Sequence, residues 1–113
     1  DENIRENLVI DFYLTLSGKD RRYKEIFSDI FYQAGLIYYD DNNYENVVVA
    51  LGQYESIAKD KDNLAQAYYL MGKSYISLNR IDLARQYFTR IVNTYPASPL
   101  TNLAKQELEK ISS

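Results

Sequence analysis

Cysteine and histidine are both absent from this chain of 113 residues, and so is tryptophan. Without cysteine there is no disulfide and no thiolate chemistry. Without histidine the chain lacks the usual general base, proton shuttle and transition-metal ligand. We therefore expect a protein that is not an enzyme, with no catalytic residues, no metal site and no cofactor.

Glycine and proline are scarce, and the acidic excess is small. Four glycines and two prolines argue against a loop-rich β fold. A net charge of −3 gives no reason to expect nucleic acid as the main partner. No apolar run approaches the ~20 residues that span a bilayer. No signal peptide is visible, so we expect a cytosolic chain, a processed chain or a trimmed piece of a longer one.

Paired carboxylates are the only material for catalysis that remains. Asp40 and Asp41 form one pair, and Asp60 and Asp62 form another. Both pairs lie in predicted turns, where aspartate is common because its side chain bonds to nearby backbone. A hydrolase that uses these carboxylates is therefore kept only as a remote alternative.

Two glycines in helix-forming surroundings are the most informative feature. Gly35 and Gly72 are 37 positions apart, because 72 − 35 = 37. The same spacing relates their neighbours, which run Phe31, Tyr38, Val47, Leu51 and then Tyr68, Tyr75, Ala84, Phe88. Glycine inside a helix costs about 1 kcal/mol relative to alanine. We expect a second helix to pack closely at each glycine, with Gly72 facing Ala84 and Gly35 facing Val47.

This pattern resembles the tetratricopeptide repeat, a helix–turn–helix unit of about 34 residues with aromatic and small residues at fixed offsets. Residues 65–96 carry the resemblance well, through Tyr68, Met71-Gly72, Tyr75, Ala84, Phe88 and Pro96. Residues 28–59 match at Phe31, Ala34-Gly35 and Tyr38, but Val47 replaces alanine and Lys59 replaces proline. The period exceeds the family norm by about three residues, a surplus that we place in the polar turn at 59–63.

The resemblance implies an all-α fold, a solenoid of antiparallel helix hairpins with about six helices in one domain over 1–113. We expect a half-repeat or capping helix at 3–16, one repeat at 21–58, a second at 64–96 and a C-terminal capping helix at 98–111. Within the repeats the helices are predicted at 21–40, 44–58, 64–78 and 82–94.

Helix ends and faces can also be predicted. Asn63 with Gln66 has the spacing of a capping box, and Ser98-Pro99 reads as an N-cap followed by the first helical residue. The last helix has an apolar stripe of Leu100, Leu103, Ala104, Leu108 and Ile111. The segment 3–16 has one of Ile4, Leu8, Val9, Phe12 and Leu16.

In the tetratricopeptide family, the first helix of each hairpin lines a concave groove that binds peptides or protein segments. The resemblance places eight residues there: Asp29, Tyr32, Leu36, Tyr39, Gln66, Tyr69, Lys73 and Ile76. This strip is largely apolar and aromatic with one cation, and it suits a peptide with apolar anchors. The alternative is that the N-terminal helix or a second molecule covers the strip. With Lys73 as its only cation, we do not expect the groove to capture a chain-terminal carboxylate.

A second resemblance concerns the end of the second repeat. Three segments carry it: Ala84-Arg85-Gln86-Tyr87-Phe88, then Thr94-Tyr95-Pro96-Ala97-Ser98-Pro99, then Leu103-Ala104 with Leu108. Together they are similar to bacterial envelope tetratricopeptide proteins, including the BamD outer-membrane assembly lipoproteins and the Tol–Pal coordinator family. This resemblance implies a periplasmic protein at the inner face of the outer membrane, held by a lipid-carrying cysteine upstream of Asp1.

We therefore predict a protein–protein interaction scaffold that helps to assemble outer-membrane proteins. Its partner would be a protein or peptide segment, and it would meet the membrane only through the lipid anchor. The alternative is a cytoplasmic adaptor or co-chaperone-like scaffold.

Overall fold

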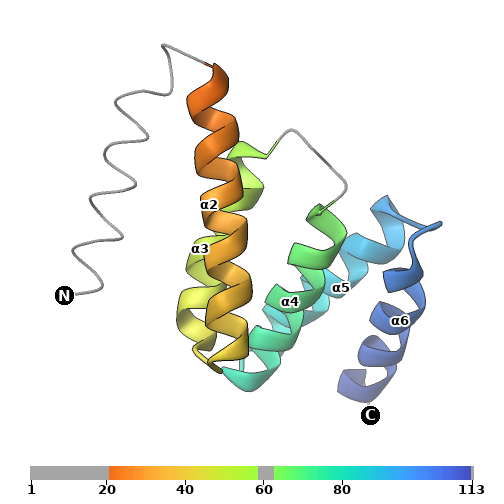
Figure 1. Ribbon diagram of the computed structural model, residues 1–113. Coiled ribbons are helices and arrows are strands. Elements are labelled where there is room, and N and C mark those ends of the chain that lie inside the picture. The colour runs from red at the N-terminus through yellow and green to blue at the C-terminus, as the bar shows by residue number, and fades with distance from the viewer. Residues whose placement is uncertain (1–20, 59–62, 113) are drawn as a thin grey trace.

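The chain forms five helices in the part that the computed structural model describes, residues 21–58 and 63–112 (Figure 1). They are α2 (Arg21–Asp40), α3 (Tyr44–Ile57), α4 (Leu64–Ser77), α5 (Ile81–Thr94) and α6 (Pro99–Ser112). Each predicted boundary within this part is met to within one residue. The sixth predicted helix, at 3–16, and the turn at 59–62 lie outside the described residues.

The turn inside each hairpin is tight because an asparagine takes a left-handed backbone conformation. Asn42 has φ 59° and Asn79 has φ 62°, and these two residues are again 37 positions apart. The Asn43 N–H bonds to the Tyr38 carbonyl at 2.9 Å, and the Arg80 N–H repeats this bond with Tyr75 at 2.8 Å. These are Schellman motifs, in which asparagine stands where glycine is commonest. The helix C-terminus is closed there, and the next helix begins at once.

The two predicted N-caps have different outcomes. Ser98 caps α6 as expected, since its Oγ accepts a hydrogen bond from the Leu100 N–H at 3.1 Å. The capping box at Asn63 is wrong, because the Asn63 side chain makes no cap hydrogen bond. Asn63 has helical backbone angles, φ −95° and ψ −6°. An N-cap side chain reaches its target from an extended backbone.

The helices form two layers. Helix α4 contacts both α2 and α6, while α3 and α5 lie on the other side, where side chains rather than close backbone approach join them. Figure 1 shows the α2–α3 hairpin beside the α4–α5 hairpin, with α6 against the far side of the second. No helix in residues 21–58 or 63–112 is both long and apolar enough to cross a bilayer.

Glycine allows the two helices of each hairpin to approach closely, as predicted. A Cβ atom added to Gly72 would lie 2.6 Å from the Phe88 ring, and one added to Gly35 would clash with the Leu51 side chain. The predicted partners, Ala84 and Val47, are therefore corrected by one helical turn. Helical side chains lean toward the N-terminus of their helix. The Phe88 ring accordingly covers the turn that carries Ala84.

The buried face of α6 also differs from the prediction. Leu103 was placed on the apolar stripe but is 41% exposed, while Thr101 and Glu107 are buried. The buried face is thus turned away from Leu103 and centred near Ala104. Thr101 is held there because its Oγ1 donates a hydrogen bond to the Tyr95 carbonyl.

Candidate functional site

The predicted groove residues lie on two neighbouring helices of the same layer. Asp29, Tyr32, Leu36 and Tyr39 come from α2, and Gln66, Tyr69, Lys73 and Ile76 come from α4. Asp29 is exposed, and the other seven are partly buried. These seven side chains are therefore partly packed against the core and partly exposed for contact with a partner.

The tyrosines of this strip are held by aromatic contacts with the second helices of the hairpins. Tyr32 packs on Tyr54 with ring centroids 5.0 Å apart, and Tyr69 meets the edge of Phe88 at 5.8 Å. Tyr39 packs on Tyr44 at 5.9 Å. Geometries of this kind contribute beyond simple burial. The three rings are therefore oriented by the fold before any partner arrives.

Burial raises the pKa of two tyrosines of the strip, Tyr32 and Tyr39, above the ordinary value of 10.0. Tyr39 of the first hairpin lies within electrostatic range of Tyr69 and Lys73 of the second. These three predicted residues thus lie on both sides of the repeat boundary. The hydroxyls of Tyr32 and Tyr39 are available as hydrogen-bond donors at physiological pH.

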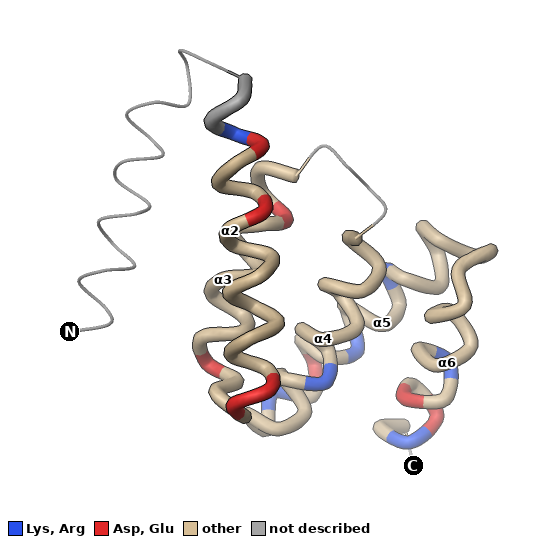
Figure 2. The backbone as a smooth tube through the Cα atoms, viewed as in Figure 1, with Lys and Arg blue, Asp and Glu red and all other residues tan. Residues whose placement is uncertain are grey.

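The single cation of the strip has a partner that sequence reasoning missed. Helix α4 carries one charged residue, Lys73 (Figure 2), and its Nζ lies 3.2 Å from an Oε1 of Glu107 on α6. The Glu107 side chain is 8% exposed, and Lys110 also approaches it at 3.5 Å. Burial alone would lower the pKa of Lys73, but its hydrogen bond and charge attraction to Glu107 raise the pKa overall.

A signal for Glu107 was present in the sequence. Glu107 follows Ala104 by three residues and precedes Ile111 by four, so it lies within the helical stripe that was expected to be apolar. An acidic residue on a buried face needs a cation nearby. Lys73 was the cation already placed on the facing helix.

A second polar cluster joins the two hairpins on the other side of α4. Arg90 Nη1 lies 2.7 Å from Glu55 Oε1, and its guanidinium stacks over the rings of Tyr87 and Tyr68 at 4.8 and 5.2 Å. The Tyr87 hydroxyl donates to Glu55 at 3.4 Å. Burial and the nearby Glu55 carboxylate raise the pKa of Tyr87 to about 12. This cluster bonds α3 to α5 through side chains and stabilises the repeat boundary.

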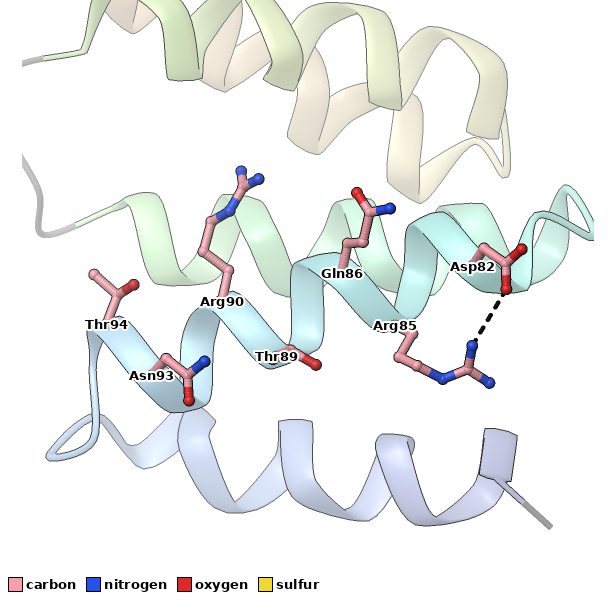
Figure 3. A pocket seen from close by; sticks show the side chains of 7 residues that line it. All are labelled: Asp82, Arg85, Gln86, Thr89, Arg90, Asn93 and Thr94. Carbon is pink, nitrogen blue, oxygen red and sulfur yellow. Dashed lines mark hydrogen bonds and ion pairs between the residues drawn. The ribbon is translucent and has the colours of Figure 1, made fainter.

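The outer face of α5 carries a polar hollow of about 770 Å³. Its lining comes from that one helix: Asp82, Arg85, Gln86, Thr89, Arg90, Asn93 and Thr94 (Figure 3). Arg85 pairs with Asp82 at 3.2 Å, and Arg90 is already bound to Glu55. The hollow is therefore wide and open, with its cations paired. The strip on α2 and α4 offers the better contact surface.

Comparison with known families gives a match in the second hairpin. Residues 66–98 match the family model described as Tetratricopeptide repeat. The match covers the α4–α5 hairpin and ends just after Pro96, and it supports a tetratricopeptide repeat protein. Comparisons with curated proteins and with solved structures found no match.

The matched repeat gives the general role of such hairpins. Tetratricopeptide repeats mediate protein–protein interaction, and the family generally provides scaffolds without catalytic activity. The first hairpin lies outside the matched segment. It nevertheless repeats the Schellman turn and the interhelical glycine of the second hairpin at the same 37-residue spacing.

Proposed function

We propose that this chain is a non-enzymatic scaffold whose strip on α2 and α4 binds a segment of a partner protein. The observation that carries the proposal is that Tyr32, Tyr39 and Tyr69, from two neighbouring helices, are half-buried and oriented by ring contacts. Tyrosine is favoured at interfaces because its ring buries a large apolar area while its hydroxyl still forms hydrogen bonds.

The chemistry of the strip defines the partner segment. Leu36, Ile76 and the tyrosines provide apolar surface for aromatic or aliphatic anchors, in an extended or helical peptide. Lys73 is already paired with Glu107. A partner carboxylate would have to displace that buried pair, so apolar anchors select the partner rather than a terminal carboxylate.

A capture experiment with matched variants tests this proposal. The wild-type chain and Tyr32→Ala/Tyr69→Ala are used to retain proteins from native membranes and from cytosol, followed by mass spectrometry. The control is Arg85→Ala/Thr89→Ala, which also carries two alanine substitutions but places them on the outer face of α5. Proteins that wild type and the control retain should be lost from the groove variant. If the groove variant retains the same proteins at unchanged thermal stability, the contact surface lies elsewhere.

We further propose that the partner belongs to the outer-membrane protein assembly machinery of a bacterial envelope. The Thr94–Pro99 stretch supports this setting through its similarity to envelope tetratricopeptide proteins. Two observations would support it: a cysteine in lipoprotein context upstream of Asp1 in the full gene, and recovery of the native protein in the outer-membrane fraction. Recovery only in cytosol, with no such cysteine, would instead favour a cytoplasmic adaptor.

A further inference from the structure

Helix α2 has an exposed isoleucine face. Ile26, Ile30 and Ile37 are 52%, 45% and 61% exposed. At about 100° per residue they fall on one side of the helix. Gly35, which faces α3, lies on the opposite side of α2. The isoleucine face therefore points away from its hairpin partner, and a cluster of large exposed aliphatic side chains marks a contact surface.

The equivalent face of α4, in the second hairpin, is covered by other helices. Adding 37 carries Ile30 to Ala67 and Ile37 to Ser74, and both of these α4 residues are 0% exposed. They lie opposite Gly72, so they face away from α5 and toward the preceding hairpin, whose helices α2 and α3 both contact α4. The same face is thus closed in the second repeat by the helices that precede it in the chain.

The chain has a suitable segment in the corresponding place. Residues 3–16 carry an apolar stripe that includes Ile4, Leu8, Phe12 and Leu16, and only the four residues 17–20 separate this segment from α2. Connections of that length commonly join consecutive helices that pack side by side. We propose that residues 3–16 dock as an antiparallel helix on the isoleucine face of α2.

This proposal fixes a register. Counting outward from the connection between residues 16 and 21, Phe12 comes level with residue 25 and Leu8 with residue 29. Each is therefore within one residue of an exposed isoleucine, Ile26 and Ile30 respectively. The antiparallel pair of α3 and α4 follows the same counting closely. Counting outward from Ile57 and Leu64 brings Glu55 level with residue 66, and the observed contact of Glu55 is with Tyr68, two residues away.

Disulfide trapping in the full chain tests the contact. The chain has no cysteine of its own, so a pair of introduced residues forms the only thiols. The test variants are Leu8→Cys/Ile30→Cys and Phe12→Cys/Ile26→Cys, two independent pairs in case one disturbs folding. The control is Leu8→Cys/Tyr32→Cys, which places the second thiol at a similar height on the groove side of α2. Products are read by non-reducing electrophoresis and intact mass.

The expected result is an intramolecular disulfide in both test variants, in about tenfold higher yield than in the control, because a disulfide needs Cα atoms within about 7 Å. Three results would overturn the proposal. Disulfide-linked dimers would show that a second copy covers the face. A higher yield in the control would place the segment over the groove. Reduced chains in both folded test variants would show that residues 3–16 do not dock on α2.

Discussion

Three glycines within helices give a sharp test of the interhelical packing. Gly35 and Gly72 lie against a neighbouring side chain, whereas a Cβ added to Gly52 of α3 would meet nothing within 4 Å apart from the adjacent backbone of its own helix. The effect of a glycine-to-alanine substitution therefore has different physical causes at these positions. At Gly52 it tests helix propensity alone, and at Gly72 it also tests the contact with Phe88.

The magnitudes separate clearly. Alanine is favoured over glycine in a helix interior by about 1 kcal/mol, so Gly52→Ala should raise the free energy of unfolding by up to about that amount. At Gly72 the new methyl would lie 2.6 Å from two ring carbons of the fully buried Phe88. Overpacking of this kind costs about 1–3 kcal/mol. After the propensity gain is subtracted, Gly72→Ala should lower stability by up to about 2 kcal/mol, and Gly72→Leu should lower it further.

Urea and thermal unfolding followed by circular dichroism measure these differences. Near this chain length 1 kcal/mol shifts the midpoint temperature by about 4 °C, so Gly52→Ala and Gly72→Ala should differ by roughly 4–12 °C. Gly35→Ala should follow Gly72→Ala, because its methyl would clash with Leu51. Equal midpoints for the Gly52 and Gly72 variants would refute the close approach of the hairpin helices.

Three further predictions address single polar groups. Ser74 Oγ is fully buried and has no hydrogen-bond partner. Ser74→Ala should therefore raise the urea midpoint, with a gain in the free energy of unfolding of about 1 kcal/mol. A variant less stable than wild type would contradict this prediction. The raised pKa of Tyr87 means that its contribution to stability is complete below pH 10.0 and is lost as pH rises to about 12. Tyr87→Phe should reduce the fall of the unfolding free energy with pH above 10.0, and an unchanged slope would show that the pKa of Tyr87 is not raised. Glu107→Gln should remove the ion pair with Lys73 and lower the thermal midpoint by more than Glu109→Gln, whose residue is exposed on the same helix.

The sequence predicted the helices because their boundaries depend on local chemistry. The turns at Asn42 and Asn79 and the cap at Ser98 are set by nearby backbone bonds, so polar clusters located the helix ends well. The close helix packing was also readable, since only a tight contact explains glycine at Gly35 and Gly72.

Pairings between distant residues were harder to predict. The partner of Gly72 was placed at Ala84 rather than Phe88, because the lean of a side chain along its helix is not visible in spacing alone. The buried face of α6 and the role of Glu107 depend on how α6 sits against α4, which apolar periodicity does not determine. Partner binding at the eight strip residues stays a prediction.

The Schellman turns also indicate where this chain tolerates changes in length. One residue inserted between Asp41 and Asn43 would break the hydrogen bond from the Asn43 N–H to the Tyr38 carbonyl. The direction in which α3 leaves the turn would change, and the packing of Val47 and Leu51 in the core would be disturbed. Insertions and deletions inside a hairpin should therefore be selected against, while length can vary between hairpins. The 37-residue period agrees with this view, because neither hairpin turn has room for the three residues beyond the usual repeat.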